Sequence, residues 1–300
     1  MVRLALVTLV GCIDYDPQSM LPPPPGAPNV QEVPDPKVTD AIVQVTTPTV
    51  DVLWTVDNSC SMDDEQDQLA SNFPYFMDYF EGSGLDFHVG VVSTDLRDPL
   101  HSGRLQPAFG YKYIDVETPS PIEVFASMAT LGVMGNSIEQ GLGASYLALE
   151  RHRDTYNAGF YREEASLTTV VISDEPDQTD PELITQPEYV GWYGGLKREA
   201  DARSYSAIVA LEGSNRGTAY INTSREIGGI VWDIETQDWS EVLDRLGFQA
   251  SGLRREYFLS QLPVEESIVV EVRTTDDVLL PPFDAGTDFT YSSPRNSVSF

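Results

Sequence analysis

Five short apolar runs lie along the middle of the chain, and each has the length of a single β-strand. The first, third and fourth runs are nearly continuous in apolar residues and rich in Val and Ile, which is typical of parallel strands covered on both faces. We therefore predict a buried, mostly parallel sheet from the runs near residues 50–56, 87–93, 168–173, 205–211 and 229–234.

Between these runs, apolar residues recur every three or four positions, which is the spacing of one face of an α-helix. Two such stripes are Leu69, Phe73, Phe76 and Phe80, and then Ile138, Leu142, Tyr146 and Leu149. The first predicts a helix over about residues 63–80, kinked at Pro74, and residues 239–246 suggest a last short helix. The alternation of strands and helices predicts an α/β fold with a doubly wound sheet flanked by helices.

This α/β domain is expected to span residues 48–250. Within it, residues 95–130 are rich in Gly and Pro and are expected to wrap the edge of the sheet. Beyond it the pattern changes to short strands without helices, near residues 257–259, 267–273 and 289–291, and the last residues also look like a strand. Residues 251–300 are therefore expected to form a small β module, which is either truncated or ends in an edge strand at Phe300.

The N-terminal residues have a different character. Residues 1–11 are apolar after a single Arg3, too few to span a bilayer, and they are interpreted as an export signal. The end of this run, Leu9-Val10-Gly11-Cys12, resembles the lipobox of bacterial lipoproteins, which implies that Cys12 carries lipid and begins the mature chain. The segment is shorter than signals of roughly 15–30 residues, and a merely apolar N-terminus with a stray cysteine is the alternative.

Residues 12–47 are proline-rich, with four consecutive prolines at 22–25, and are expected to be an extended, disordered spacer. Together with a lipidated Cys12, this predicts a protein of the bacterial cell envelope, anchored to a membrane through lipid, on the periplasmic side or at the cell surface. Cys60, the one other cysteine, would then have no disulfide partner, and we expect it to pack as a small apolar residue.

The charge of the chain excludes one class of partner. It has 47 acidic and 18 basic residues, for a formal net charge of −29, and its basic residues are scattered. A surface this negative repels phosphate backbones and anionic headgroups, so we expect no nucleic-acid binding.

The most informative motif follows the first strand run, where Asp57, Ser59 and Ser61 occupy alternate positions. In open α/β sheets, ligands bind at the carboxyl ends of the strands. One carboxylate and two hydroxyls are hard oxygen ligands, which suit Mg²⁺, Mn²⁺ or Ca²⁺. Asp174 follows the strand run at 168–173 and would meet the same edge of the sheet.

The pattern Asp57-Asn58-Ser59-Cys60-Ser61 resembles the metal-ion-dependent adhesion site (MIDAS) of von Willebrand factor type A domains. The resemblance covers roughly residues 48–250. It implies that Asp57, Ser59, Ser61 and Asp174 hold a divalent cation, together with a residue of the Gly-rich turn, where the family has a threonine and this chain has Asn136, with Ser137 beside it. It also implies binding, in which a partner protein donates a carboxylate to the metal, rather than catalysis.

Three alternatives stay open. Ser61 and Asp64 match a capping box, so Ser61 could cap the first helix instead of binding a metal. The chain could be a structural envelope lipoprotein whose site holds no metal. It could also be a metal-dependent hydrolase; however, the general acid that dehalogenase-like phosphohydrolases carry two residues after their aspartate is replaced here by Ser59, and no nucleophile elbow or phosphate-binding loop is present.

Overall fold

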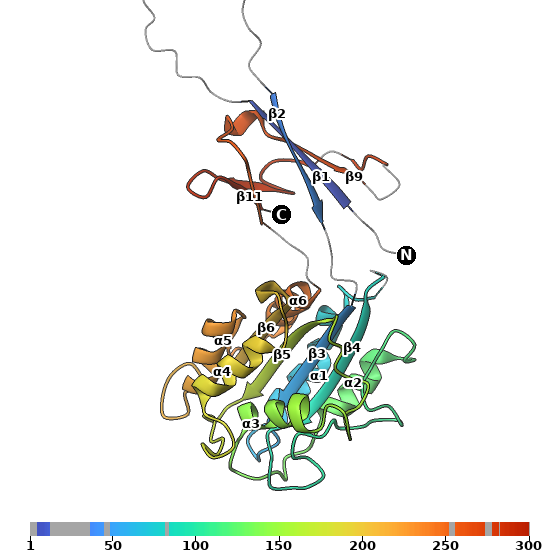
Figure 1. Ribbon diagram of the computed structural model, residues 1–300, viewed down its shortest axis with the longest axis vertical. Helices are drawn as coiled ribbons and strands as arrows, with labels where there is room; N and C mark the ends of the chain where they lie inside the picture. The colour runs from blue at the N-terminus through green and yellow to red at the C-terminus, as the bar shows by residue number, and fades with distance from the viewer. Residues whose placement is uncertain are drawn as a thin grey trace, which may run out of the picture. The chain divides into compact units, whose positions relative to one another are not determined.

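The computed structural model describes residues 5–12, 37–44, 49–81, 84–251, 256–273, 278–281 and 283–299. The chain divides into two compact units (Figure 1). The first contains Thr46–Gly252, and the second combines Arg3–Val45 with Leu253–Phe300. The α/β unit is thus an insertion between two parts of the second unit.

The first unit is built on a five-stranded sheet in which every neighbouring pair is parallel. Its strands are β3 (Thr49–Val56), β4 (Asp86–Ser93), β5 (Ser166–Ser173), β6 (Arg203–Val209) and β7 (Val231–Asp233). Their order across the sheet is β4-β3-β5-β6-β7. The prediction of a doubly wound α/β fold is confirmed, and each strand overlaps one of the five apolar runs.

Helices cover both faces of this sheet (Figure 1). One face packs against α1 (Asp63–Met77), α2 (Pro121–Ala129) and α6 (Ser240–Ala250). The other packs against α3 (Gly141–Tyr146), its π-helical continuation Leu147–Arg151, α4 (Gln186–Gly195) and α5 (Thr218–Ile227). The stripe that begins at Ile138 therefore becomes helical only from Gly141.

The central strand β3 contributes to both layers because its side chains alternate between the faces. Val52, Trp54 and Val56 point into the α1/α2/α6 layer, and Leu53 points into the other. Trp54 is fully buried and meets Phe76 edge-on, with ring centroids 5.2 Å apart. Removing an aromatic side chain of this kind from a core costs about 3–5 kcal/mol of stability.

Residues 95–130 run beside β4, as the sequence predicts, because Ile114 pairs antiparallel with Val89 and the Gln106 amide donates to the Val91 carbonyl. They also contain α2, which the sequence pattern did not reveal.

The connections from the sheet reverse direction between β3 and β5. The chain leaves β3 toward α1 on one face and leaves β5 toward α4 on the opposite face. Such a reversal is the point at which open α/β sheets bind ligands. Asp57 and Asp174 are the first residues after these two strands.

The second unit contains two small antiparallel sheets. One has the order β2-β1-β9, formed by β2 (Lys37–Gln44), β1 (Ala5–Cys12) and β9 (Val269–Arg273). The other has the order β10-β11-β8, formed by β10 (Thr290–Ser292), β11 (Ser297–Ser299) and β8 (Glu256–Phe258). Buried side chains of this unit include Tyr257, Val270, Phe289 and Val298.

This arrangement differs from the expected boundaries in two places. Lys37–Gln44 lie in β2 rather than in an extended spacer, because this end of the segment is free of proline and rich in β-branched residues. Residues 5–11, interpreted as part of a removable signal that ends before Cys12, lie in β1, which pairs with both β2 and β9. The remaining spacer residues, 13–36 and 45–47, lie outside the described residues. Among the helices that the structure describes, none is long and apolar enough to cross a bilayer.

Candidate metal site

The loop after β3 folds tightly around the Asp57 carboxylate. Asp57 is fully buried, and its amide donates to the Ile172 carbonyl (3.0 Å), so the β3–β5 pairing extends to the site. Its Oδ1 accepts a hydrogen bond from the Ser59 amide (2.8 Å). This turn brings the Ser59 and Ser61 hydroxyls to 3.3 Å from each other. The three residues of the motif therefore lie together, as the sequence predicts.

Helix α1 begins beside this loop but is not capped by it. The residue before the helix is Met62, and no side-chain cap hydrogen bond is present, so the capping alternative for Ser61 is wrong. Gln66 connects helix and loop instead: its Nε2 donates to the Asp57 carbonyl at 2.9 Å. The Ser61 hydroxyl thus remains available to a ligand.

The end of β5 supplies a residue that the sequence analysis missed. The Ser173 hydroxyl donates to Asp57 Oδ2 at 2.5 Å. Burial raises the pKa of Asp57, and the hydrogen bonds from Ser173 and Ser59 partly offset this rise. The next residue, Asp174, has a buried oxygen, Oδ1, with no hydrogen-bond partner. Ser173 could not be identified from the sequence, because only the register between β3 and β5 brings it to Asp57.

Asn136 and Ser137, the two candidate ligands from the Gly-rich turn, are not hydrogen-bonded to Asp57 in the described part of the chain. Asn136 Oδ1 accepts a hydrogen bond from the Ile138 amide (3.0 Å), and the Asn136 amide donates to Asp95 Oδ2 (3.1 Å). Ser137 is exposed. Their role as ligands therefore stays a prediction.

Glu139, two positions before α3, is the acidic residue from this turn that reaches Asp57. Its side chain is fully buried, its Oε2 accepts a hydrogen bond from the Thr94 hydroxyl, and its Oε1 has no hydrogen-bond donor. Burial and the negative charge of Asp57 raise the pKa of Glu139 to about 8. The sequence signal that could have identified Glu139 is its position as an acidic residue between Ile138 and Leu142, within an apolar stripe.

Further acidic groups surround this pair. Burial raises the pKa of Glu65, and the charges of Asp174 and Asp57 add to the rise; its Oε2 is also buried without a partner. The same two aspartates, after burial, raise the pKa of Glu175. In the absence of a cation, burial and the neighbouring carboxyls therefore raise the pKa values of the acidic groups at this site.

The loops around the site are held together by Asn58. Its Oδ1 accepts a hydrogen bond from Ser93 Oγ (2.8 Å), and its carbonyl accepts one from the Gly135 amide (2.9 Å). A Cβ at position 135 would overlap the Asn58 side chain, so this close approach requires glycine. Cys60, by contrast, is exposed, and the expectation that it packs inside is wrong: the turn that buries Asp57 points residue 60 outward.

The donor set is suited to a hard divalent cation. In the described part of the chain, no three His, Cys, Asp or Glu side chains form a metal site on their own. The candidate set instead mixes serine hydroxyls with carboxylates, as oxygen-binding cations accept. Glu139 Oε1 and Asp174 Oδ1 are each buried without a hydrogen-bond partner, as the oxygen of a cation ligand is when no cation is bound.

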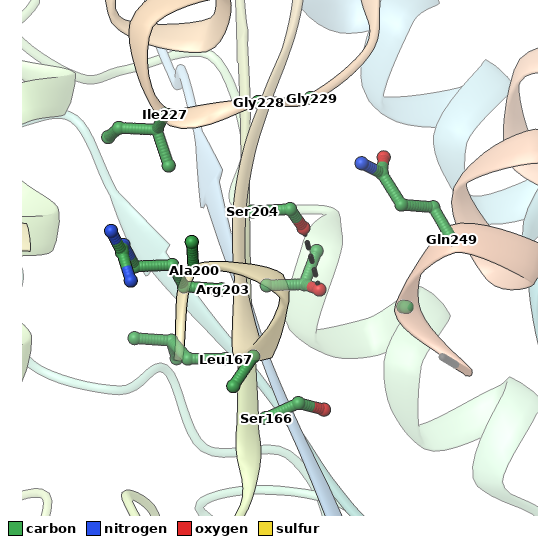
Figure 2. Close-up of a pocket in the computed structure, with 12 residues that line it drawn as sticks. Ser166, Leu167, Ala200, Arg203, Ser204, Ile227, Gly228, Gly229 and Gln249 are labelled. Carbon is green, nitrogen blue, oxygen red and sulfur yellow. Dashed lines mark hydrogen bonds between the residues drawn. The ribbon is translucent and has the colours of Figure 1, made fainter. Parts of the chain in front are cut away.

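A pocket lies at the amino ends of β5 and β6, at the opposite edge of the sheet from Asp57 (Figure 2). It is lined by Ser166, Arg203, Ser204 and Gln249, among others. Its hydroxyls are already paired, since Thr168 Oγ1 and Ser204 Oγ lie 3.0 Å apart, and Arg203 Nη1 donates to the Glu199 carbonyl. We therefore base the functional argument on the Asp57 site.

Comparison with known proteins gives little further guidance. No family model matches the chain, and no curated protein matches it. Among solved structures, it is similar to proximal thread matrix protein 1 from the mussel byssus. The sequence identity is 10%, the match covers 73% of this chain and 51% of that protein, and the TM-score is 0.43. The chain thus spans about half the length of that protein, and we draw no conclusion from a match at this score.

Proposed function

We propose that the α/β unit is a von Willebrand type A-like domain that binds a partner protein through a divalent cation. The observation that carries this proposal is the buried Asp57 carboxylate between two strand ends, beside paired serine hydroxyls and the unpartnered Asp174 Oδ1. Asp57, Ser59, Ser61 and Asp174 would hold Mg²⁺, Mn²⁺ or Ca²⁺, and Asn136 or Ser137 would contribute from the Gly-rich turn. The bound cation supplies the positive charge that attracts an aspartate or glutamate of the partner.

The charge of the chain supports this dependence on a cation. With a formal net charge of −29, the protein repels an acidic partner unless a positive centre is present at the contact. The buried Asp57 is held by Ser173 and Ser59 in a fixed orientation. Such a fixed carboxylate is suited to binding and offers no exposed nucleophile, so we propose a binding protein and not an enzyme.

The proposed location is the bacterial cell envelope, with a lipid anchor on Cys12. The lipobox-like Leu9-Val10-Gly11-Cys12 supports it. This proposal has a consequence for the second unit, because the residues of β1 that pair with β9 are Leu6–Val10, all of which precede Cys12. Cleavage before Cys12 would remove that pairing, so the processed chain and the β1–β9 sheet exclude each other.

The test is calorimetric titration of the full chain with Mg²⁺, Mn²⁺ and Ca²⁺. Asp57→Ala removes the central carboxylate, and Asp154→Ala is the matched control, since Asp154 is exposed and paired only weakly with Arg153. We expect saturable binding in the parent and the control and none in Asp57→Ala. A parent that is folded but binds no cation would overturn the proposal and favour a structural role.

A further inference from the structure

Glu139 has the properties of a cation ligand, although it belongs to no recognised sequence motif of the chain. It is fully buried, it contacts the Asp57 carboxyl, and no donor reaches its Oε1. Two ionised carboxylates repel each other and cannot hydrogen bond to each other. Their contact in a buried site is therefore stable only with a shared proton or with a positive ion between them.

The backbone around Glu139 fixes its position from three sides. The Gln178 amide donates to the Glu139 carbonyl (2.6 Å), and the next residue, Gln140, donates its amide to the Thr94 carbonyl (3.2 Å). The Thr94 amide in turn donates to the Val56 carbonyl, one residue before Asp57 (3.1 Å). The Thr94 hydroxyl then binds Glu139 Oε2, which leaves Oε1 as the free oxygen of the carboxylate.

An acid with a purely structural role would be expected to use both oxygens. A buried unpartnered oxygen costs free energy, and most such atoms in folded proteins are satisfied. Here Oε2 accepts the hydrogen bond from the Thr94 hydroxyl, and Oε1 is buried without a hydrogen-bond partner. The arrangement matches a ligand positioned by Thr94.

We propose that Glu139 is a direct ligand of the cation at the Asp57 site, and that it makes the site prefer Ca²⁺ over Mg²⁺. This inference rests on the function proposed above. With Glu139, the site offers the carboxylates of Asp57 and Glu139 in addition to the hydroxyls of Ser59 and Ser61. Ca²⁺ accepts six to eight oxygens with flexible geometry and binds carboxylates through one or both oxygens, whereas Mg²⁺ requires a near-ideal octahedron and usually keeps several waters.

The same donor set changes how a partner would be recognised. Carboxylates from within the domain neutralise more of the cation's charge than hydroxyls do. The cation is then retained without a partner, and the partner's carboxylate contributes to the contact less than at a site held mainly by hydroxyls. Exposed apolar side chains such as Met134 (95% exposed), next to Gly135 of the Gly-rich turn, would then add to the contact with the partner.

The experiment is calorimetric titration of Ca²⁺ and of Mg²⁺ into the full chain and three variants. Glu139→Gln keeps the shape and removes the charge, and Glu139→Thr replaces the carboxylate with a hydroxyl. Glu117→Gln is the control, because Glu117 is an exposed acid. Circular dichroism and thermal unfolding without metal establish that each variant is folded.

The expected result is tighter binding of Ca²⁺ than of Mg²⁺ by the parent. Both Glu139 variants should lose Ca²⁺ affinity by about tenfold or more, with a smaller loss for Mg²⁺, and the control should not change. If the parent binds a cation but Glu139→Gln retains its Ca²⁺ affinity, or if the parent prefers Mg²⁺, the Glu139 inference is overturned and the proposed function stands. If the folded parent binds no cation, both are overturned. The parent's own preference is decisive even if a variant does not fold.

Discussion

The Ser173 hydroxyl donates a 2.5 Å hydrogen bond to Asp57 Oδ2 and so joins the ends of β5 and β3 at the candidate metal site. These residues are far apart in the sequence and meet only through the parallel register of the two strands, in which Val56 pairs with Ile172. Asp57 consequently has one oxygen oriented by its own loop, through Ser59, and the other by a neighbouring strand.

Ser173→Ala tests whether this orientation matters for cation binding. We expect cation affinity to fall by about tenfold, as is typical when the partner of a ligand is removed. The stability of the cation-free protein should fall by about 1–2 kcal/mol, the cost of a lost buried hydrogen bond. Ser166→Ala is the control at the other end of β5, where the serine hydroxyl makes only a 3.5 Å contact to the Thr49 carbonyl. Equal cation affinity in the two variants would contradict the prediction.

Gly135→Ala tests the packing between the Gly-rich turn and the Asp57 loop. The added Cβ would overlap Asn58, which bridges the two loops, so we expect a loss of about 1–3 kcal/mol of stability and weaker cation binding. Gly191→Ala provides the contrast, since nothing lies near the Cβ position of this residue in α4. Because alanine has a higher helix propensity than glycine, Gly191→Ala should leave the stability of the protein unchanged or raise it slightly. Chemical denaturation of both variants measures the difference, and similar effects would refute the packing argument.

Lys197 gives the folded protein a dependence on alkaline pH that is separate from the metal site. Its side chain is buried, and its Nζ donates to the Arg162 and Glu163 carbonyls. Burial lowers the pKa of Lys197 to about 8, from an ordinary value of 10.5. Between these values the unfolded chain holds a proton that the native chain has released, so this group makes the free energy of unfolding rise with pH in that window.

Lys197→Met should remove this contribution. The difference in the free energy of unfolding between parent and variant is expected to shift in favour of the parent from pH 8 to pH 10.5. Lys112→Met is a matched control, because Lys112 is exposed but also donates to a carbonyl, that of Tyr156, and lies over a tyrosine ring. A pH-independent difference for Lys197→Met would show that its burial has no effect on titration.

The lipid anchor is tested by the mass and partitioning of the mature protein. In a bacterial host that processes lipoproteins, we expect the parent chain to begin at Cys12, to carry lipid, and to enter the detergent phase of a Triton X-114 separation. Cys12→Ser should keep residues 1–11 and stay in the aqueous phase. An unmodified parent chain that retains residues 1–11 would contradict the anchor and agree with the β1 strand pairing.

Much of the fold could be predicted from local patterns. Strands β3, β5 and β6 are buried on both faces of the sheet. Because both faces are covered, apolar residues follow one another in these strands instead of strictly alternating with polar ones, and this made the strands recognisable in the sequence. Helices α2, α4 and α5 were missed. Gly and Pro in and around them interrupt the apolar spacing, as with Pro187 and Gly191 in α4, and tertiary contacts supply their stability.

In the candidate site, too, residues that are close in the sequence could be predicted, and residues brought together only by the fold could not. Asp57, Ser59 and Ser61 are neighbours in sequence, so their proximity could be predicted. Ser173 and Glu139 could not, because their contacts with Asp57 depend on strand register and on the path of the turn before α3. The pairing of β1 with β9 in the second unit could not be predicted for the same reason, because the two strands come from opposite ends of the chain.

The most direct measurement of the central claim is the anomalous difference density of crystals of the full chain grown with Mn²⁺. We predict a single strong peak at the carboxyl ends of β3 and β5, within about 2.0–2.6 Å of oxygens of Ser59, Ser61 and at least one of Asp57, Glu139 and Asp174. Density confined to surface carboxylates, with no peak beside Asp57, would contradict the account.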